Sequence, residues 1–536
     1  MLYAGASALA LAGPVMAQDA RSSRLQVTPY VEAQQLLYAN LDGGGGDDVV
    51  TYTQLAAGVD AVIANRNAMG QLSYRYDRFI GWEDGQQDQS VHSGFARVSL
   101  VAVPDLLSFD AAGIATRART SLRGASPEFF AGDTRNTTQV YALYAGPSFA
   151  RSLDGIDVSA AYHIGYVHAD TGQGGFDLGP GAPVLEDYSS AVSHRVDARI
   201  GMRPGALPFG WAVSGGLIRE DARRLDARFD DRFVRGDVTV PVTYALALVG
   251  GIGYEEIEAS QRQILTDAAG NALLDEDRRF QGDPNRPRVL VYDQDGMIWD
   301  VGVLWRPDRR TSLEARYGHR YGGEVWYGNF SHQLSETATV QAGVYNQLET
   351  FGLGLTAAVA TLPTSFAGVN NPFTGALDGC VFGNGQGGAC LDNPLQSVNG
   401  SLFRARGAWA LWSGGRGPWS YGVGLAYAQR RYIATTFGNG LYSFDGVKDE
   451  SVTAQANLGR QLSTSAALSG NLYATWYDSG LPGAPSVVTY GASGFYSKSF
   501  SNHLVGQAGA GLYSSEQEGV EDPIVGSLLV GLRYQF

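Results

Sequence analysis

The last fourteen residues, 523–536, constrain the fold of this chain more than any other stretch. Apolar residues and glycine occupy one side-chain phase there, and mostly polar residues and glycine occupy the other, with Leu529 as the exception. The apolar phase consists of Gly526, Leu528, Val530, Leu532, Tyr534 and Phe536. Because successive side chains of a strand point to opposite faces, the pattern predicts a β-strand with one apolar and one polar face.

The same period of two recurs along most of the chain. Clear examples are residues 52–64, 69–82, 192–200, 244–254, 313–320 and 419–427. Segments of about ten residues are long enough for a tilted strand to cross the hydrocarbon layer of a membrane. No stretch offers about 18 uninterrupted apolar residues, so we do not expect a transmembrane helix as the main anchor.

The connections between these segments are predicted to alternate between short and long. Short turns are expected near Asn65, Pro104, Asp154, Pro204, Pro241, Pro307, Glu336, Gly415, Thr464 and Asn502. Longer connections are expected near Gly44, Gly85, Ser126, Gly174, Asp230, Asp275, Gly322, Gly383, Gly440, Pro482 and Gln517. This order predicts about 22 strands, within a range of about 20 to 24, that start and finish on the same side.

A closed barrel explains this pattern best. In lipid every unpaired backbone group is costly, and only a closed sheet has no edge. The alternating strand that ends in Tyr534 and Phe536 also resembles the closing strand and assembly signal of bacterial outer-membrane barrels. We therefore expect an all-β, transmembrane, antiparallel up-and-down β-barrel in the bacterial outer membrane. Its expected partners are outer-membrane lipid, lipopolysaccharide or glycolipid, and the assembly machinery. A soluble array of hairpins is the competing architecture.

The amino-terminus is predicted to be an export signal. Residues 2–16 are apolar and small, and residues 15–17 fit a cleavage site, although no Lys or Arg precedes them. We expect a signal peptide at residues 1–17 and a barrel over residues 18–536. Because the first strand begins at Leu25, we expect no separate plug domain.

Strand phase predicts which charged side chains face the barrel lumen. These are Arg75, Asp77, Arg195, Asp197, Arg199, Glu314, Arg316, Arg320, Arg404 and Arg406. Ladders of arginine and carboxylate would neutralise the wall. A surplus of arginine would instead favour anionic solutes such as uronate-bearing or phosphorylated glycans. The net charge of −14 argues against nucleic acid as a partner.

Two long connections are expected to be extracellular loops, near residues 260–295 and 351–400. The first is charged; the second retains many apolar residues and the only two cysteines, Cys380 and Cys390. In an oxidising compartment these cysteines are expected to form a disulfide, and metal ligation is the weaker interpretation. The apolar loop is expected to pack against the inner wall, another loop or a neighbouring barrel, or else to form a surface cap with its own small core.

No pattern of residues predicts catalysis or a cofactor. The seven histidines are scattered, and no nucleophile elbow, zinc motif or phosphate loop is present. Residues 43–48 and 293–296 could attract Ca²⁺, but each is more typical of a turn. We therefore expect no enzyme, no resident metal and no cofactor.

Residues 302–307 (GVLWRP), 311–323 (TSLEARYGHRYGG), 329–332 (NFSH) and 27–32 (VTPYVE) carry a family resemblance. They resemble the outer-membrane barrel family associated with PEP-CTERM and exopolysaccharide systems, whose sphingomonad members are often labelled preprotein translocase subunits. The resemblance implies a barrel in the envelope and a link to polysaccharide export. It transfers no functional residues.

Two functions are consistent with such a barrel. The first is a passive or gated conduit, porin-like or associated with exopolysaccharide export, for polysaccharide or small solutes. This function follows from a barrel too wide for wall side chains alone to fill. The alternative is a structural, lattice-forming outer-membrane protein without transport activity. A homo-oligomer is compatible with either.

Overall fold

The computed structural model describes most of the chain from residue 24 onward. The described residues are 24–41, 49–82, 88–119, 137–170, 188–269, 271–276, 278–367, 371, 373–374, 380–383, 388–391, 395–434, 445–481, 483–518 and 524–536. The predicted signal peptide (1–17) and the predicted calcium-attracting turn at residues 43–48 lie outside them. Among the described residues, no helix is both long and apolar enough to cross a bilayer.

Twenty-two strands form one antiparallel sheet. The first eleven are β1 (Arg24–Asn40), β2 (Val49–Ala64), β3 (Ala68–Gly81), β4 (Gln89–Val103), β5 (Leu107–Arg119), β6 (Thr137–Leu153), β7 (Ile156–Asp170), β8 (Ser190–Met202), β9 (Gly210–Ala222), β10 (Ala227–Pro241) and β11 (Leu246–Arg262). The other eleven are β12 (Arg288–Trp305), β13 (Thr311–Arg320), β14 (Gly323–Ser335), β15 (Ala338–Glu349), β19 (Leu402–Arg416), β20 (Trp419–Ile433), β21 (Lys448–Ser463), β22 (Ala466–Asp478), β23 (Val487–Ser499), β24 (Leu504–Gln517) and β25 (Ile524–Gln535).

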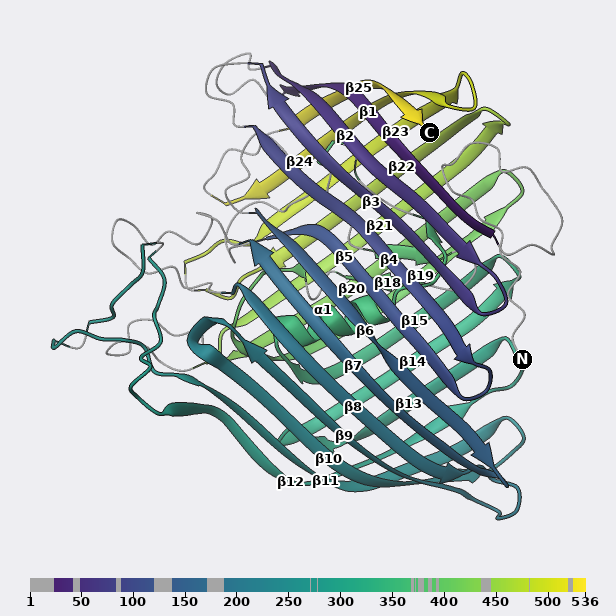
Figure 1. Ribbon diagram of the computed structural model, residues 1–536, viewed down its shortest axis with the longest axis vertical. Coiled ribbons are helices and arrows are strands. Elements are labelled where there is room, and N and C mark those ends of the chain that lie inside the picture. Colours follow the sequence, from purple (N-terminus) through teal and green to yellow (C-terminus); the bar gives the residue numbers. More distant parts are fainter. Residues whose placement is uncertain are drawn as a thin grey trace.

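The sheet closes on itself, because β1 pairs with both β2 and β25. The closing register runs from Tyr30 opposite Gln535 to Asn40 opposite Val525. Figure 1 shows the strands tilted around a wide barrel. This closure confirms the prediction of a large all-β antiparallel barrel of about 22 strands.

The connections occur in the predicted order, with one misplaced position and one unexpected tight turn. The connection expected near Asp230 lies earlier, at Arg223 and the 3-10 turn η1 (Arg224–Asp226), and Asp230 is part of β10. The turn between β13 and β14 consists of Tyr321 (φ 55°) and Gly322 (φ 66°). Two residues with positive φ suit the twist of a hairpin, which explains how a connection on the long-loop side can be so short.

The charged region predicted as a loop at 260–295 is partly strand. β11 extends to Arg262 and β12 begins at Arg288. Between them only isolated bridges occur in the described residues, such as Ile264 opposite Gly282. Residues 293–296 lie within β12, so the second calcium-attracting turn is a strand.

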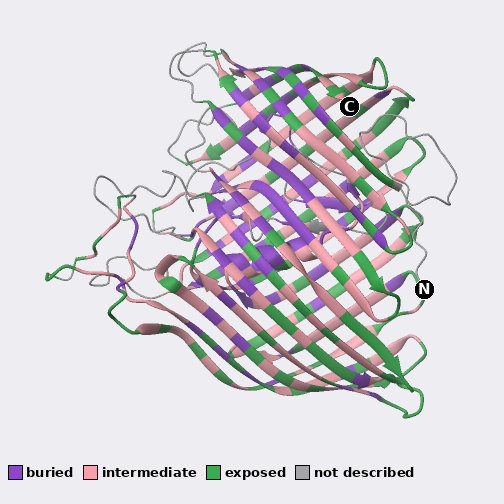
Figure 2. Cartoon of the chain, viewed as in Figure 1, coloured by how far each residue is buried: buried purple, intermediate pink, exposed green. Residues whose placement is uncertain are grey.

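The outward face of the barrel is apolar. Leu528, Val530 and Leu532 are 52–66% exposed, whereas Ser527 between two outward positions is 2% exposed. Figure 2 shows the buried residues gathered around the middle of the barrel and toward the longer connections, while the short-turn ends are exposed. An apolar exterior on a closed sheet is what a lipid bilayer requires. We call the end with the longer connections the extracellular end, as in bacterial barrels.

Residues 350–401, here called the inner segment, connect β15 to β19, and those of them that the structure describes lie inside the barrel (Figure 1). They contain α1 (Phe351–Ala360), β16 (Phe366–Ala367), β17 (Cys380–Gly383) and β18 (Gly388–Cys390). Figure 1 shows α1 enclosed by the strands. The segment predicted as an extracellular loop therefore fills part of the lumen, and the inner wall is its packing partner.

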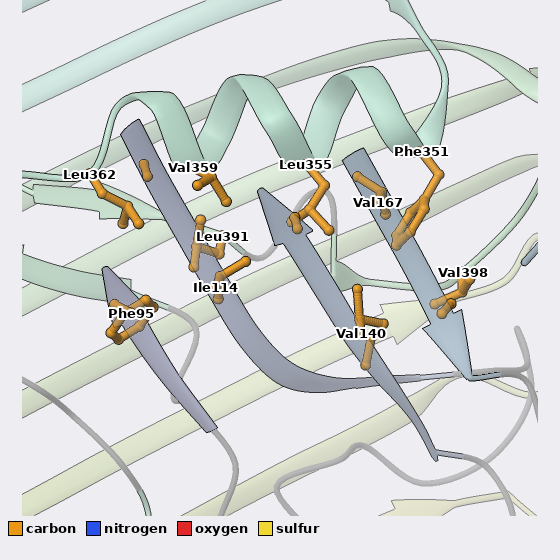
Figure 3. Packing of buried hydrophobic residues seen from close by; sticks show 14 of the residues in the cluster. Phe95, Ile114, Val140, Val167, Phe351, Leu355, Val359, Leu362, Leu391 and Val398 are labelled. Carbon is orange, nitrogen blue, oxygen red and sulfur yellow. The ribbon is translucent and has the colours of Figure 1, made fainter. Parts of the chain in front are cut away.

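Helix α1 packs against the inner faces of β5 to β8. Phe351, Leu355 and Val359 point from the helix toward the wall, as Figure 3 shows. The wall opposite them is apolar and small, with Ile114, Val140, Val167, Ala112, Ala118, Ala142, Ala169 and Ala191. Small side chains let a helix approach the sheet closely, so this part of the wall is a receptor for α1.

Candidate functional site

The candidate site is the lumen where the inner segment meets the wall. Three wall glutamines bind its backbone. Gln71 on β3 donates from Nε2 to the carbonyl oxygen of Phe366 and accepts from its N–H, both at 3.0 Å. Gln455 on β21 accepts from the N–H of Cys380 (2.8 Å), and Gln341 on β15 accepts from the N–H of Gly388 (3.2 Å). These contacts satisfy strand edges that would otherwise lack partners.

An aromatic pocket holds Phe373 of the inner segment. Its ring lies 5.2 Å from that of Phe495 and 5.9 Å from that of Tyr513. The hydroxyl of Tyr38 on β1 donates to the carbonyl oxygen of Phe373 at 2.6 Å. This pocket involves β1, β23 and β24, whereas the helix receptor is on β5 to β8 and the other glutamine contacts are on β15 and β21, so the described part of the inner segment extends across the lumen.

A disulfide joins Cys380 to Cys390, which face each other across β17 and β18. The neighbouring wall strand β20 carries glycine where this small sheet lies close. A Cβ at Gly422 would be 2.7 Å from the ring of Phe382, and one at Gly424 would be 2.7 Å from the sulfur of Cys380. Glycine at these two positions therefore lets the disulfide-linked sheet dock on the wall.

The amino-terminal end of the inner segment is anchored at Glu220 on β9. Thr350 caps α1 by accepting from the N–H of Leu353 (3.1 Å), and its hydroxyl donates to Glu220 Oε1 (2.6 Å). The buried carboxylate lies near the positive end of the helix dipole, which favours it there. Tyr188, just before β8, lies beside this carboxylate, and burial together with Glu220 raises the pKa of its phenol.

The carboxy-terminal end is anchored at a fully buried ion pair between Arg430 on β20 and Asp449 on β21. Arg430 also donates to Ser397, at 2.8 Å to its hydroxyl and 3.3 Å to its carbonyl oxygen. Tyr432 donates to Asp449 at 2.9 Å. Both charges and their hydrogen-bonding groups are thus paired away from water, as a buried ion pair requires.

Most of the predicted lumen residues lie on the inner wall, and most of the arginines there are ion-paired. Arg75 contacts Glu32 and Asp77, each at 2.8 Å. Arg316 contacts Glu314 (2.7 Å) and Asp300 (3.1 Å). Arg195 pairs with Asp197 at 2.8 Å, and Arg320 pairs with Glu255 and Asp231. The side chain of Arg199 is exposed. Ladders of arginine and carboxylate therefore describe this wall better than a surplus of free arginine.

Arg404 and Arg406 do not face the lumen. They share the phase of Trp412, which is 42% exposed on the outside of β19, whereas Phe403 and Ala405 face inward and are buried. Arg404 donates to Asn346 (2.9 Å) and to the carbonyl oxygen of Glu324. The prediction failed because the inner segment covers this part of the wall and keeps water away from it. The apolar face of β19 therefore points into the barrel.

Tyr534 and Phe536 lie at the short-turn end, beside the beginning of β1. Their rings are 5.2 Å apart, and the N–H of Phe536 donates to the carbonyl oxygen of Pro29 at 3.0 Å. Their role as an assembly signal stays a prediction. Among the described residues, no group of three or more His, Cys, Asp or Glu side chains could hold a metal ion.

The closed sheet, its apolar exterior and the ion pairs of its inner wall define a bacterial outer-membrane β-barrel. Neither a protein family nor a curated protein matches the chain. Solved structures similar to it include the FrpB iron transporter of Neisseria meningitidis (12% identity, 95% of this chain and 81% of that chain, TM-score 0.43). Others are the ferric-catecholate import receptor Fiu of E. coli K12 (9%, 95% and 81%, 0.44) and the alcaligin outer-membrane receptor FauA of Bordetella pertussis (11%, 94% and 76%, 0.38).

Proposed function

We propose that this barrel is a gated conduit for hydrophilic solutes, and that the inner segment is its gate. The observation that carries the proposal is the docking of the described residues of the inner segment across the lumen, at several separate sites on the wall. A barrel of this size without a filling element would leave an aqueous channel. The described inner wall carries partly exposed ion pairs such as Arg195 with Asp197, which suits a water-filled path.

The way in which the inner segment is attached to the wall would allow the segment to move. Glu349 and Phe403 are register partners in β15 and β19, so the segment leaves and re-enters the wall at one place. Elsewhere the described part of the segment is held mainly by side-chain hydrogen bonds and packing, with one backbone hydrogen bond from the N–H of Val398 to the carbonyl oxygen of Arg119 at 3.0 Å. The barrel is complete without it, because β15 pairs directly with β19. The segment could therefore leave its docking sites while the barrel stays closed.

We extend the proposal to glycans as the cargo. The support is the resemblance of residues 302–332 to outer-membrane barrels of exopolysaccharide systems, together with a wall whose arginines are mostly neutralised by carboxylates. Paired charges on the wall can hydrogen-bond to a passing solute without strongly favouring anionic or cationic solutes. Small polar solutes would follow the same path.

Conductance in planar bilayers tests the gate. One variant replaces residues 352–398 with a short Gly/Ser linker, which is long enough because Glu349 and Phe403 are adjacent. We expect brief or small openings from the wild type and steady, much larger conductance from the variant. A matched control replaces residues 267–273 of the β11–β12 connection, which take no part in the lumen contacts of the inner segment described above, and should leave the wild-type behaviour unchanged.

Equal conductance of the wild type and the variant without the inner segment would overturn the gate. Silence of both proteins, folded and inserted, would overturn the conduit. That second outcome would favour the structural, lattice-forming alternative.

A further inference from the structure

A cavity lies at the extracellular end, between the wall and the two ends of the inner segment. The centre of a water molecule can reach about 90 Å³ of it, within a space of about 890 Å³ that includes open solvent. Thr350 and Asn399 line it from the two ends of the segment, and Glu220, Phe229 and Phe280 line it from the barrel and the β11–β12 connection. A ligand in this cavity would touch both ends of the proposed gate.

Among the buried polar atoms of the lining, Ser189 Oγ, Glu220 Oε2 and Asn399 Nδ2 have no hydrogen-bond partner within the described part of the chain. Glu220 Oε2 is an acceptor and Asn399 Nδ2 is a donor, on residues that are 3% and 2% exposed. The orientation of the Asn399 amide follows from its own turn, because its Oδ1 accepts from the N–H of Ser401 at 2.8 Å. Buried polar atoms are nearly always paired, so each of these two atoms points to a missing partner.

Charges around the cavity argue against an ionic ligand. Arg224 pairs with Asp275 at 3.2 Å, and Arg228 pairs with Asp221 at 2.7 Å. Asp275 neutralises Arg224, Arg228 shares the carboxylate of Asp221 with Arg219 (2.9 Å), and an added anion would lie near the carboxylate of Glu220. A cation would find only that one carboxylate among the described lining residues, next to two arginines. A neutral ligand is the remaining class.

The ligand must also have an apolar side. Phe229 and Phe280 are each 4% exposed and line the cavity together with Ala259. Ligand sites usually combine such apolar walls with a few oriented polar groups. A hydroxyl group can donate to Glu220 and accept from Asn399, whereas a ring of C–H groups can cover the phenyl rings.

We propose that this cavity binds one neutral sugar residue of a glycan, with hydroxyls placed between Glu220 and Asn399. The proposal rests on the conduit function and names its substrate class and its control. Glu220 also holds Thr350, and Asn399 belongs to the returning end of the gate, so a sugar bound here has different contacts in the docked and the released state. Binding therefore shifts the gate equilibrium by that difference in affinity.

Saturation-transfer NMR on the folded full-length barrel tests the binding. The probes are maltotriose, chitotriose, galactobiose and mannotriose, with glucose 6-phosphate and glucosamine as charged comparisons. We expect saturable binding of at least one neutral probe and weaker or no binding of both charged ones. E220Q keeps an oxygen for Thr350 but replaces the second acceptor by a donor, and N399L removes the amide. Each should weaken binding at least tenfold.

N471L makes the same change on the inner wall away from the cavity and should bind as the wild type does. A259F fills the cavity from the wall and should abolish binding while circular dichroism shows an intact barrel. This variant keeps the test meaningful if E220Q or N399L fails to fold.

Absence of binding by every neutral probe would overturn the sugar site, as would equal binding by wild type and A259F. Either result leaves the conduit intact if the variant without the inner segment still conducts. Failure of that conductance, with sugar binding retained, would instead overturn the conduit alone.

Discussion

The side chain of Gln71 pairs with the backbone of Phe366 as a neighbouring strand would, through one donated and one accepted hydrogen bond of 3.0 Å each. Gln71 belongs to β3 of the wall, and Phe366 is the first residue of the small sheet in the inner segment. The amide carries no charge, so the contact depends little on salt or pH. A neutral contact of this kind holds the small sheet of the inner segment at the wall without competing with the ion pairs of the lumen.

Replacing Gln71 by Leu should loosen the gate. Both backbone groups of Phe366 lose their partners, and each unsatisfied group costs about 1–3 kcal/mol where water is excluded. We expect faster hydrogen exchange around residues 362–367 and longer open times in bilayers. Q507L is the matched control, because the side chain of Gln507 bonds to Gln34 on the wall. Similar hydrogen exchange and similar open times in the two variants would contradict the proposal that Gln71 holds the inner segment at the wall.

Removing the disulfide should affect the inner segment and leave the barrel intact. The bridge closes a short loop between Cys380 and Cys390, and such loops contribute about 3 kcal/mol through the unfolded chain. In the C380S/C390S double variant we expect faster exchange in β16 to β18 and unchanged exchange in β1 to β15. Hydrogen exchange with mass spectrometry measures both. Loss of protection throughout the barrel would show that the bridge stabilises the whole fold.

The barrel could be predicted from the sequence because each strand and each turn is specified by residues that are close together in the chain. Alternation in each strand follows from the pleat, and a turn is marked by Pro, Gly, Asn or Asp within a few residues. The misplaced turn near Asp230 shows the limit of that rule. The real turn at Arg223–Asp226 uses Leu225 with φ 47°, a conformation that leucine rarely adopts and that no local signal announces.

The packing inside the lumen could not be predicted in the same detail, because an apolar strand face can contact either lipid or protein. Phe403 and Ala405 are buried against the inside, and alternation alone cannot distinguish that environment from the outside of Leu528. The alanines of β5 to β8 were a possible signal. They form a row of small inward side chains opposite a connection that retains apolar residues, which together indicate an internal helix receptor.

Breaking the buried ion pair should destabilise the protein strongly. Arg430 and Asp449 are both fully buried, so R430M leaves a carboxylate without its counter-charge. Removal of one partner of such a pair typically costs about 3–5 kcal/mol. We expect a clear fall in the midpoint of urea unfolding followed by tryptophan fluorescence. R203M breaks an exposed pair with Asp157 and should leave the midpoint unchanged. Equal losses would show that burial does not set the strength of these pairs.

A charge on the outside of the closing strand should impair folding more than one on the inside. Leu528 is 55% exposed near the middle of β25, whereas Gln507 on the adjacent strand bonds to Gln34 inside the barrel. An arginine at mid-membrane on the lipid face costs about 2–4 kcal/mol, and one on the wet inner wall costs little. In folding assays with lipid vesicles, L528R should give a lower folded fraction than Q507R on heat-modifiable gels. The reverse order would place the apolar phase of β25 in the interior, and the membrane orientation of the barrel would then be wrong.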